Sequence, residues 1–500
     1  MSATYDSLHA RAAKLSRLNE AQEVLHWDMS AMMPDGGMES RGEQLAVLSG
    51  LCHSMLTATE MADAIDAAEA DQAHLTDWQA ANVRELKRQH IAATALSESL
   101  VEAISRAATA CETAWRDAKP RGDFKAVLPT LETMVSLSRE AALARGAVLN
   151  LAPYDALLDQ YDPGTRETDF SDVFDRLTAE LPPLLQSVLD HQARQPAPQM
   201  PVGAFPISSQ KALAENLMQT IGFDFNHGRL DESRHPFCGG VPDDVRITTR
   251  YDEADFTKAL MGVLHETGHA MYERGLPADW RGQPVGHALG MTMHESQSLL
   301  VEMQVCRSLA FLDFARPHML SAFDAPAGDA SWSIENLERL YTKVERGFIR
   351  VDADEITYPL HVILRYRLEK ALMTDAMQPA DLPMAWNEGM QELLGVTPPS
   401  DTEGCLQDIH WYDGAYGYFP TYTLGAMAAA QIFAAARAAI PTMDDDIRGG
   451  NFADLFAWLR SNIHGMGSKL STQETLSHAT GTTLSAEPFL AHLKSRYLPS

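Results

Sequence analysis

Apolar side chains recur every three or four residues through most of this chain, which is the spacing of helices with one buried face. The pattern is helical from Tyr5 to about Leu151 and returns after His294. It predicts helices over Ala62–Ala95, Leu96–Ala118, Phe170–Leu189, Ser331–Val351, Ile356–Met373, Leu382–Leu394, Leu424–Ile440, Asn451–Ile463 and Ala486–Tyr497. The chain is therefore expected to be mainly α.

Strand-like alternation occurs in one region, over Gly228–Phe237 and Val245–Tyr251. Cys238–Gly240 and Pro242–Asp244 are expected to form the turn between these segments. A small sheet here can hold an extended peptide by strand addition, or it can be a structural hairpin. Both interpretations remain open at this stage.

Composition and charge narrow the class of protein. The chain has 500 residues, 45% of them hydrophobic, so a large core is available. A formal net charge of -28 argues against nucleic acid or an anionic membrane as a partner. Five scattered cysteines without a CxxC pair indicate free thiols in a reducing compartment.

Neither a secretory signal nor a membrane span is expected. The first sixteen residues contain charged side chains and no apolar segment of the signal-peptide type. The longest apolar run, Leu424–Ile440, contains Gln431 and Arg437 and predicts a buried helix. These features favour a soluble cytoplasmic protein.

The candidate chemistry centres on a HExxH motif within an apolar helical run that Gly275 ends. His265 and His269 are four residues apart and share one helix face, where two imidazoles can bind one zinc ion. Glu266 can then take a proton from a water on the metal. Gly268 costs about 1 kcal/mol in a helix interior, which a gap beside a metal, a close backbone contact or a packing requirement would explain.

A catalytic zinc usually has a third protein ligand. Glu295 is the preferred candidate, because it lies on a predicted helix downstream of the motif. Two alternatives stay open: Thr292 and Glu295 have the spacing of a helix capping box, and His294 could be the ligand instead.

Several further motifs resemble those of the carboxypeptidase Taq family of zinc metallocarboxypeptidases, over nearly the full length. They are HETGH at 265–269, HESQS at 294–298, DxRxT from Asp244 to Thr248, IRxxAD from Ile349 to Asp354, GxxQDxHW from Gly404 to Trp411, GYFPTYxLG from Gly417 to Gly425, HPF from His235 to Phe237, and Trp27–Asp28 with Met33–Pro34.

The resemblance implies a fold similar to that of neurolysin and angiotensin-converting enzyme, with two helical halves flanking a deep groove. Residues 1–500 would then form one peptidase domain, with halves of about 1–200 and 201–500. It also implies a homodimer that removes single C-terminal residues from peptides with broad specificity. Zn²⁺ is the expected metal, and Co²⁺ or Mn²⁺ would also bind.

The family's motifs also contain the remaining site candidates. A donor to the developing oxyanion is expected among His410, Tyr418 and Tyr422, with Tyr422 and His410 preferred. Arg350 is the preferred anchor for the substrate's terminal carboxylate, and Arg246 is the second candidate.

Structural interpretations of the same residues remain open. Arg350 can instead form a salt bridge with Asp352 or Asp354, and Arg246 can hold the hairpin. Asp354 or Glu273 can orient a neighbouring side chain.

Two other functions compete with the carboxypeptidase. One is a zinc oligopeptidase that cuts internal bonds or releases dipeptides from short peptides. The other is a helical binding protein that keeps a metal for stability, although Glu266, His410 and Tyr422 argue against it.

Overall fold

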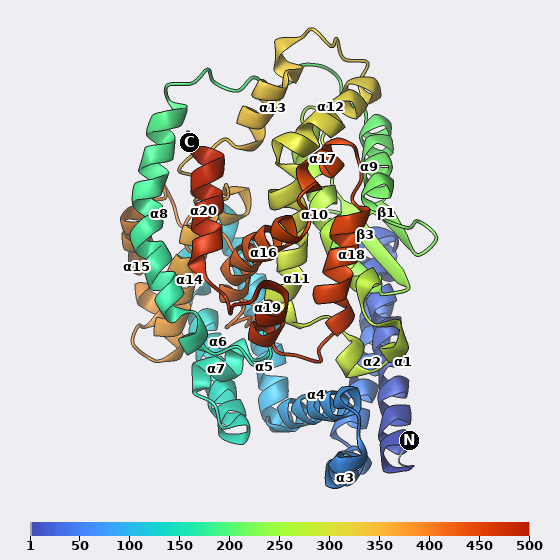
Figure 1. The fold of residues 1–500 in the computed structure, drawn as a ribbon. Helices are drawn as coiled ribbons and strands as arrows, with labels where there is room; N and C mark the ends of the chain where they lie inside the picture. The colour runs from blue at the N-terminus through green and yellow to red at the C-terminus, as the bar shows by residue number, and fades with distance from the viewer. Residues whose placement is uncertain (1–2, 500) are drawn as a thin grey trace.

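The computed structural model describes residues 3–499 as a mainly α protein with one three-stranded sheet (Figure 1). The helices before the sheet are α1 (Ala3–Ala31), α2 (Met38–Thr57), α3 (Thr59–Ala70), α4 (Asp77–Thr94), α5 (Glu98–Ala118), α6 (Phe124–Leu149), α7 (Pro153–Leu158), α8 (Ser171–Gln192) and α9 (Ile207–Ile221). Those after it are α10 (Phe256–Gly275), α11 (Gly290–Leu299), α12 (Leu309–Ala322), α13 (Ile334–Tyr341), α14 (Tyr358–Met373), α15 (Leu382–Leu394), α16 (Pro420–Ala439), α17 (Met443–Arg448), α18 (Ala453–Asn462), α19 (Thr472–Thr480) and α20 (Ala486–Tyr497). The predicted class, mainly α with a small sheet, is confirmed.

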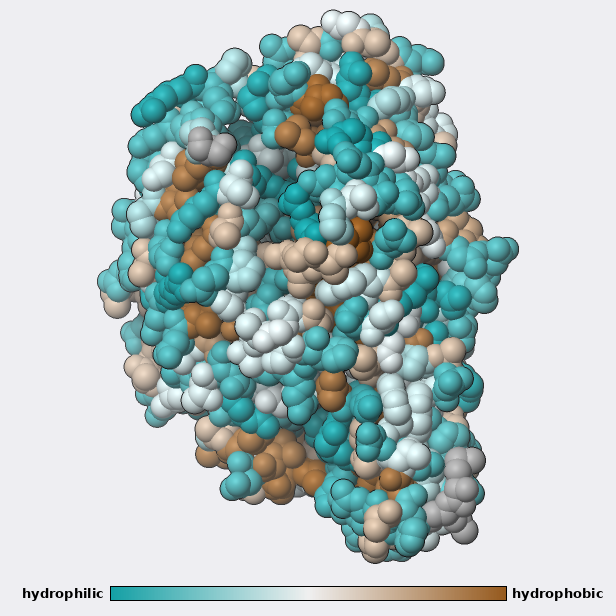
Figure 2. Space-filling model, in the orientation of Figure 1, coloured by the Kyte–Doolittle hydropathy of each residue, from teal (hydrophilic) through white to brown (hydrophobic). Residues whose placement is uncertain are grey.

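One large hydrophobic core holds most of the molecule together. Its buried residues run from Cys111 on α5 to Tyr497 on α20, and a smaller core joins α1, α3 and α4. In Figure 1, α10, α11 and α16 lie in the middle, with α8 and α20 on one side and α1 and α2 on the other. Hydrophilic side chains cover most of the face in Figure 2, as the high net charge leads one to expect.

The expected two-stranded hairpin was wrong, because this region forms a three-stranded sheet. It contains β1 (Gly228–Glu232), β2 (Phe237–Val241) and β3 (Asp244–Thr249) in the order β1-β3-β2. β1 pairs with β3 in parallel and β2 pairs with it antiparallel. The predicted single strand over Gly228–Phe237 is broken before Pro236, which has no N–H to donate to a ladder. Cys238–Gly240, expected to turn, belongs to β2.

Two predicted helices were too long: the helix expected over Ala62–Ala95 is divided into α3 and α4 by residues 71–76, and the one over Ser331–Val351 ends early. The range 331–351 contains α13, most of a 3₁₀ turn over Ala330–Trp332 and the start of another over Arg350–Asp352, with a non-helical segment between α13 and the second turn. Side chains take over the backbone hydrogen bonds there: Gln192 accepts from the Val344 amide and Asp354 from the Glu345 amide. The helices predicted over Leu382–Leu394 and Ala486–Tyr497 are confirmed at both ends.

The apolar run Leu424–Ile440 lies in α16, whose residues are mostly buried in the core. Within residues 3–499, no helix combines the length and apolar character that crossing a membrane requires. All five cysteines are free, as expected from their spacing.

Two glycines allow α10 and α16 to approach α11 from either side. A Cβ on Gly268 of α10 would lie 2.6 Å from the Gln297 carbonyl oxygen and 2.6 Å from Ser298 Cα. A Cβ on Gly425 of α16 would lie 2.9 Å from Glu295 Cβ. Real side chains do not come this close, so both positions require glycine. A close backbone contact, one of the reasons considered from the sequence, therefore explains Gly268.

This contact predicts opposite effects for two glycines of the same helix. Gly268→Ala should destabilise the protein by about 1–3 kcal/mol, because the methyl group overpacks α10 against α11. Gly262→Ala is the matched control, since a Cβ there meets nothing within 4 Å. It should stabilise the protein by about 0.5–1 kcal/mol, because alanine favours a helix interior. Thermal unfolding followed by circular dichroism measures both; equal shifts for the two variants would contradict the packing argument.

Candidate metal centre and active site

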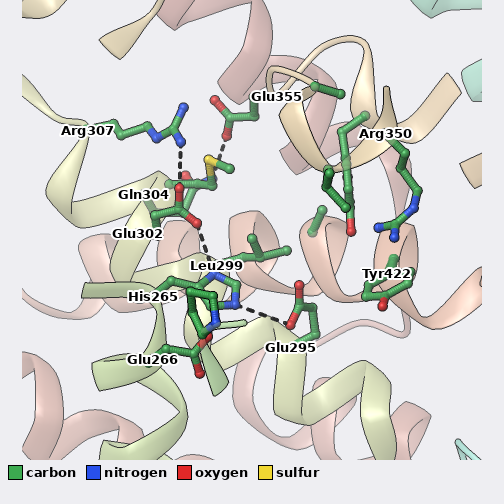
Figure 3. Close-up of a pocket in the computed structure, with 16 residues that line it drawn as sticks. His265, Glu266, Glu295, Leu299, Glu302, Gln304, Arg307, Arg350, Glu355 and Tyr422 are labelled. Atoms are coloured by element: carbon green, nitrogen blue, oxygen red, sulfur yellow. Dashed lines mark hydrogen bonds and ion pairs between the residues drawn. The ribbon is translucent and has the colours of Figure 1, made fainter. Parts of the chain in front are cut away.

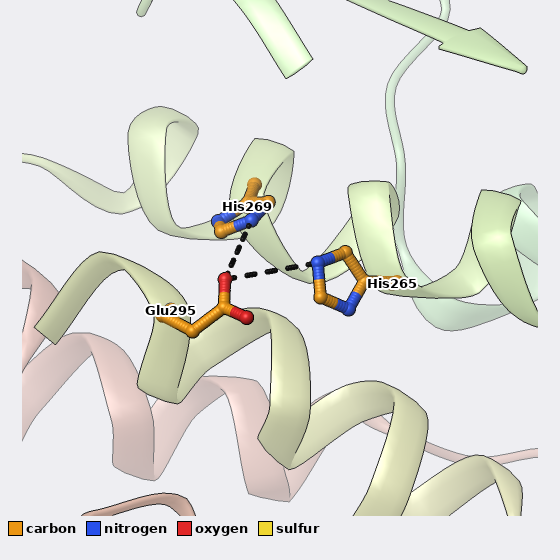
Figure 4. A group of neighbouring side chains, drawn as sticks. All are labelled: His265, His269 and Glu295. Atoms are coloured by element: carbon orange, nitrogen blue, oxygen red, sulfur yellow. Dashed lines mark ion pairs between the residues drawn. The ribbon is translucent and has the colours of Figure 1, made fainter. Parts of the chain in front are cut away.

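Two helices bring a His–His–Glu group together. Asp255 caps the start of α10 by accepting a hydrogen bond from the Thr257 amide, and the helix presents His265 and His269 on one face. Glu295 of α11 points its carboxylate at both rings (Figure 4). Its Oε2 lies 3.4 Å from His269 Nε2 and 3.7 Å from His265 Nε2. The candidate ligand atoms of the three residues all lie within 4.8 Å of one another.

The geometry and the donor types fit a divalent cation. Protein nitrogen and oxygen ligands bind zinc at about 2.0–2.2 Å, which places tetrahedral ligands about 3.3–3.6 Å apart. The distance from Glu295 to His269, 3.4 Å, falls within this range, and the distance to His265, 3.7 Å, is just above it. His265 Nδ1 is hydrogen-bonded at 2.9 Å to Glu302, so its Nε2 is the nitrogen that faces Glu295.

The electrostatics of the group also favour a cation. Burial alone lowers the pKa of His265, but Glu295 and Glu302 beside it raise the value to about 10. Burial raises the pKa of Glu295, but the two histidines lower it to about 2. Burial and the neighbouring His294 lower the pKa of His269 to about 4. The carboxylates therefore stabilise positive charge between the rings, where a metal ion would supply it.

Of the residues considered for the third ligand, Glu295 is the one that faces both histidines. Glu295 lies in the interior of α11, which starts at Gly290 and has no side-chain cap at its first turn, so the capping-box interpretation was wrong. His294 Nε2 contacts Glu273 at 2.9 Å, and its ring stacks on His269 with centroids 4.4 Å apart. His294 is outside the candidate ligand group.

Glu302 is a functional residue that reasoning from the sequence missed. It lies on a π-helical segment, Leu300–Cys306, that continues α11. One carboxylate oxygen holds His265 Nδ1 at 2.9 Å and the other accepts from Arg307 at 2.5 Å. Such partners fix the orientation and tautomer of a ligand histidine. The sequence offered one indication, a glutamate seven residues after Glu295. Hydrophobic spacing, however, does not reveal a π-helical segment, so the direction of the Glu302 side chain could not be predicted.

Of the two residues expected to orient neighbours, Asp354 lies away from the metal group and Glu273 lies next to it. Asp354 accepts from the amides of Ile356 and Thr357 at the start of α14, so it organises the backbone there. Glu273 contacts His294 at 2.9 Å, and that ring stacks on His269, so Glu273 lies behind the metal group.

The metal group opens onto a cavity of about 460 Å³. Figure 3 shows His265, Glu266 and Glu295 in the lower part of the view, with Glu302 and Arg307 above them on the left and Arg350 and Tyr422 on the right. Glu266 is only 7% exposed, and burial raises its pKa to about 7. That value suits proton transfer near neutral pH.

The three candidate oxyanion donors form one aromatic cluster. Tyr422 lines the cavity, and its hydroxyl lies 3.4 Å from His410 Nε2, the long end of the hydrogen-bond range. Tyr418 packs edge-on against Tyr422, with ring centroids 5.1 Å apart. Burial, together with Arg350 and Arg365, lowers the pKa of His410 to about 4. His410 is therefore neutral at pH 7 and can exchange a hydrogen bond with the Tyr422 hydroxyl.

The two arginine candidates have different surroundings. Arg350 lines the cavity, is 6% exposed, and has its guanidinium 4.8 Å from the Tyr422 ring centroid. Its salt bridge is with Asp408 at 2.8 Å, so the expected partners Asp352 and Asp354 were wrong. Arg246 lies on β3, where it pairs with Asp244 at 2.6 Å and stacks over Trp27 at 4.2 Å.

Comparisons with known proteins agree along the whole chain. The family model described as carboxypeptidase Taq (M32) metallopeptidase matches residues 7–497. Thermostable carboxypeptidase 1 of Thermus thermophilus is 37% identical, over 99% of this chain and 98% of its own. The structure of Trypanosoma cruzi metallocarboxypeptidase 1 superposes with a TM-score of 0.96 at 39% identity, covering 99% of each chain. An M32 carboxypeptidase from Deinococcus radiodurans gives 0.94 at 35% identity, with the same coverage.

The contacts of Glu302 predict an effect on metal affinity. Glu302→Gln should weaken binding of a divalent metal by about 10- to 100-fold, because His265 loses the carboxylate that orients it. Glu273→Gln is the control, since its partner His294 is outside the ligand group, and it should change affinity much less. Titration against a competing chelator measures both affinities. A larger loss of affinity in Glu273→Gln than in Glu302→Gln would show that Glu302 does not have the orienting role.

Proposed function

Because the chain belongs to the carboxypeptidase Taq (M32) family and is a metallocarboxypeptidase that releases C-terminal residues, we propose a role for each residue around the cavity. The observation that carries the proposal is that one cavity is lined by two of the three candidate ligands, His265 and Glu295, together with a buried glutamate and an arginine. A peptide lying between Arg350 and Glu266 would present its last bond to the metal group.

His265, His269 and Glu295 would hold one divalent metal. Zinc is the proposed ion, because two imidazoles and one carboxylate suit it, although cobalt or manganese would also bind such a site. The metal would supply Lewis acidity toward water and the scissile carbonyl.

Glu266 is the proposed general base. It takes a proton from the attacking water and returns it to the nitrogen of the leaving residue. Its burial supports this role, because a carboxylate with a pKa near 7 is a stronger base than an exposed one and can still be ionised at neutral pH.

Tyr422 is the proposed donor to the oxyanion that develops on the carbonyl. It lines the cavity beside Glu295, and His410 contacts its hydroxyl from behind. Such a donor is worth about 3 kcal/mol in other hydrolases. Tyr418 packs on Tyr422 and supports its orientation.

Arg350 is the proposed anchor for the substrate's terminal carboxylate. Its pairing with Asp408 does not remove this role, because Asp408 is shared with Arg365, which approaches at 2.6 Å. Two buried arginines on one carboxylate leave a net positive charge. Arg246 is less suited, since its guanidinium is occupied by Asp244 and Trp27 outside the cavity.

The larger architecture is proposed from the family resemblance. Residues 1–500 would form a single catalytic domain, with about 1–200 and 201–500 as two halves of a deep groove like that of neurolysin and angiotensin-converting enzyme. The packing of α8 against α14, α15 and α20 supports a single domain. We also propose a cytoplasmic homodimer with broad specificity for the released residue and no nucleic-acid or membrane partner.

The competing function is an oligopeptidase that cleaves internal bonds or releases dipeptides. One peptide in two forms, free acid and C-terminal amide, separates the two with metal-loaded protein. The carboxypeptidase should release one residue from the acid and leave the amide intact. Glu266→Gln should lower kcat by about 10²- to 10⁴-fold, the usual contribution of a general base. Equal cleavage of both forms at an internal bond would reassign the protein to the oligopeptidases.

The anchor can be tested separately. Arg350→Lys should lower kcat/KM for the free acid by about 10- to 100-fold, because lysine cannot make the paired hydrogen bonds of a guanidinium. Arg246→Lys is the matched control and should change kcat/KM by less than about threefold, since one lost hydrogen bond outside the cavity does not touch the substrate. A strong loss in Arg246→Lys with none in Arg350→Lys would move the anchor to β3.

A further inference from the structure

Glu369 is a buried carboxylate in the interior of α14 that has no place in the roles proposed so far. Its side chain is 0% exposed. Oε1 accepts hydrogen bonds from the Tyr154 hydroxyl at 2.8 Å and from the Gly417 amide at 2.8 Å. Oε2 accepts from the Trp411 indole at 2.9 Å. Among residues 3–499, no salt bridge reaches Glu369.

A buried carboxylate without a cation is costly, and this one depends on its donors. Burial raises the pKa of Glu369 to about 7, while the hydrogen bonds from Trp411, Tyr154 and Gly417 oppose the rise. An apolar residue at this place would avoid that cost but would leave an indole N–H and a backbone N–H buried without acceptors. The role of the carboxylate is therefore to accept hydrogen bonds from these buried donors, and it is not needed to stabilise α14 itself.

Those groups flank the candidate catalytic side chains. Trp411 follows His410 directly, and Gly417 precedes Tyr418 directly. The segment between them contains no helix or strand; turn hydrogen bonds, such as that from the Ala415 amide to the His410 carbonyl at 2.7 Å, shape it locally, and contacts with other elements place it. Gly417 also lies close against α7: a Cβ there would be 2.6 Å from the Leu157 carbonyl carbon. One carboxylate therefore holds both ends of the segment that presents His410 and leads into Tyr418 and Tyr422.

We infer that Glu369 is a positioning residue for the reaction: by binding Trp411 and Gly417 it fixes His410 and the two tyrosines relative to the cavity. The inference rests on the proposed function of His410 and Tyr422. Glu369 lies behind these residues and acts through them without touching the substrate.

Glutamine is the sharpest substitution at this position. Glu369→Gln keeps the volume but replaces one oxygen by an NH₂ group, which must face either the Trp411 N–H or an N–H or O–H at the other oxygen. One donor then loses its acceptor and the segment shifts. We expect kcat to fall about 10- to 100-fold, the effect of a displacement near 1 Å, with KM changed less than threefold and metal content unchanged.

A merely structural role is separated by a matched control. Asn336 on α13 is also buried; it donates to the Gln199 and Ser331 carbonyls and accepts from the Gln199 amide, away from the aromatic cluster. Asn336→Asp is the reverse isosteric exchange and should lower the melting temperature with kcat within about twofold, because the mismatch is remote from the site. If Glu369→Gln likewise loses stability alone, with kcat unchanged, the inference is overturned.

A double-mutant cycle tests the route through Trp411. If Glu369 acts by holding this segment, Trp411→Phe and Glu369→Gln should not be additive: the double variant should lose little more kcat than the worse single variant. A loss equal to the product of the two single losses would show that Glu369 acts independently of Trp411 and would overturn the inference.

The crystal structure of Glu369→Gln gives a readout that needs no assay. The inference requires the His410 ring and the Tyr422 hydroxyl, 3.4 Å apart in the parent, to move by about 1 Å relative to Glu295 and the rest of the cavity. If His410 and Tyr422 keep their positions relative to the cavity in this variant, the positioning role is refuted, whether or not the enzyme is active. A wild-type protein that releases no C-terminal residue would instead refute the proposed function, and the crystal structure would still decide the role of Glu369.

Discussion

The close contact of α10, α11 and α16 is the constraint on which the rest of the structure depends. Glu295 reaches the two histidines only because α11 lies against α10 at Gly268, and it is pressed from the other side by α16 at Gly425. A methyl group added at either glycine would push the helices apart by more than a metal site tolerates, because its ligands must be placed to a few tenths of an ångström. The same helix contact places Tyr422, on α16, beside Glu295. Backbone packing therefore sets the ligand geometry and the position of the proposed oxyanion donor together.

Around this contact, most buried charges of the active-site region are tied to partners from other elements. Glu302 joins the π-helical segment to His265 and Arg307, and Asp408 joins a loop to Arg350 and Arg365. Such pairs contribute little to the net stability of the protein, because desolvation offsets the attraction. Removing one partner, however, strongly destabilises the protein, because the other charge is left buried and unpaired. Their value here is geometric: each fixes a side chain that faces the cavity. Glu369 follows the same principle with neutral donors in place of a cation.

The sequence predicted what depends on local spacing and on motifs, and it failed where tertiary contacts decide. The two histidines and Glu266 follow from helical periodicity, and Glu295 from its helix and from the family's motif. The partner of Arg350 did not follow, because Asp408 is 58 residues away in the chain. The three-stranded sheet did not follow either, because parallel pairing of β1 with β3 depends on a crossover that periodicity cannot show.

Charges close to the proposed anchor, Arg350, matter more for holding a terminal carboxylate than the net charge of the chain. A formal net charge of -28 should repel a peptide whose terminus is a carboxylate. At physiological ionic strength, however, exposed charges more than about 8 Å away are largely screened, whereas buried charges are screened much less. Arg350 and Arg365 are buried around a single carboxylate, so their surplus positive charge acts at short range and in a low-dielectric setting. An acidic surface and the proposed carboxylate anchor at Arg350 are therefore compatible, and the excess of acidic residues can serve solubility without weakening that proposed contact.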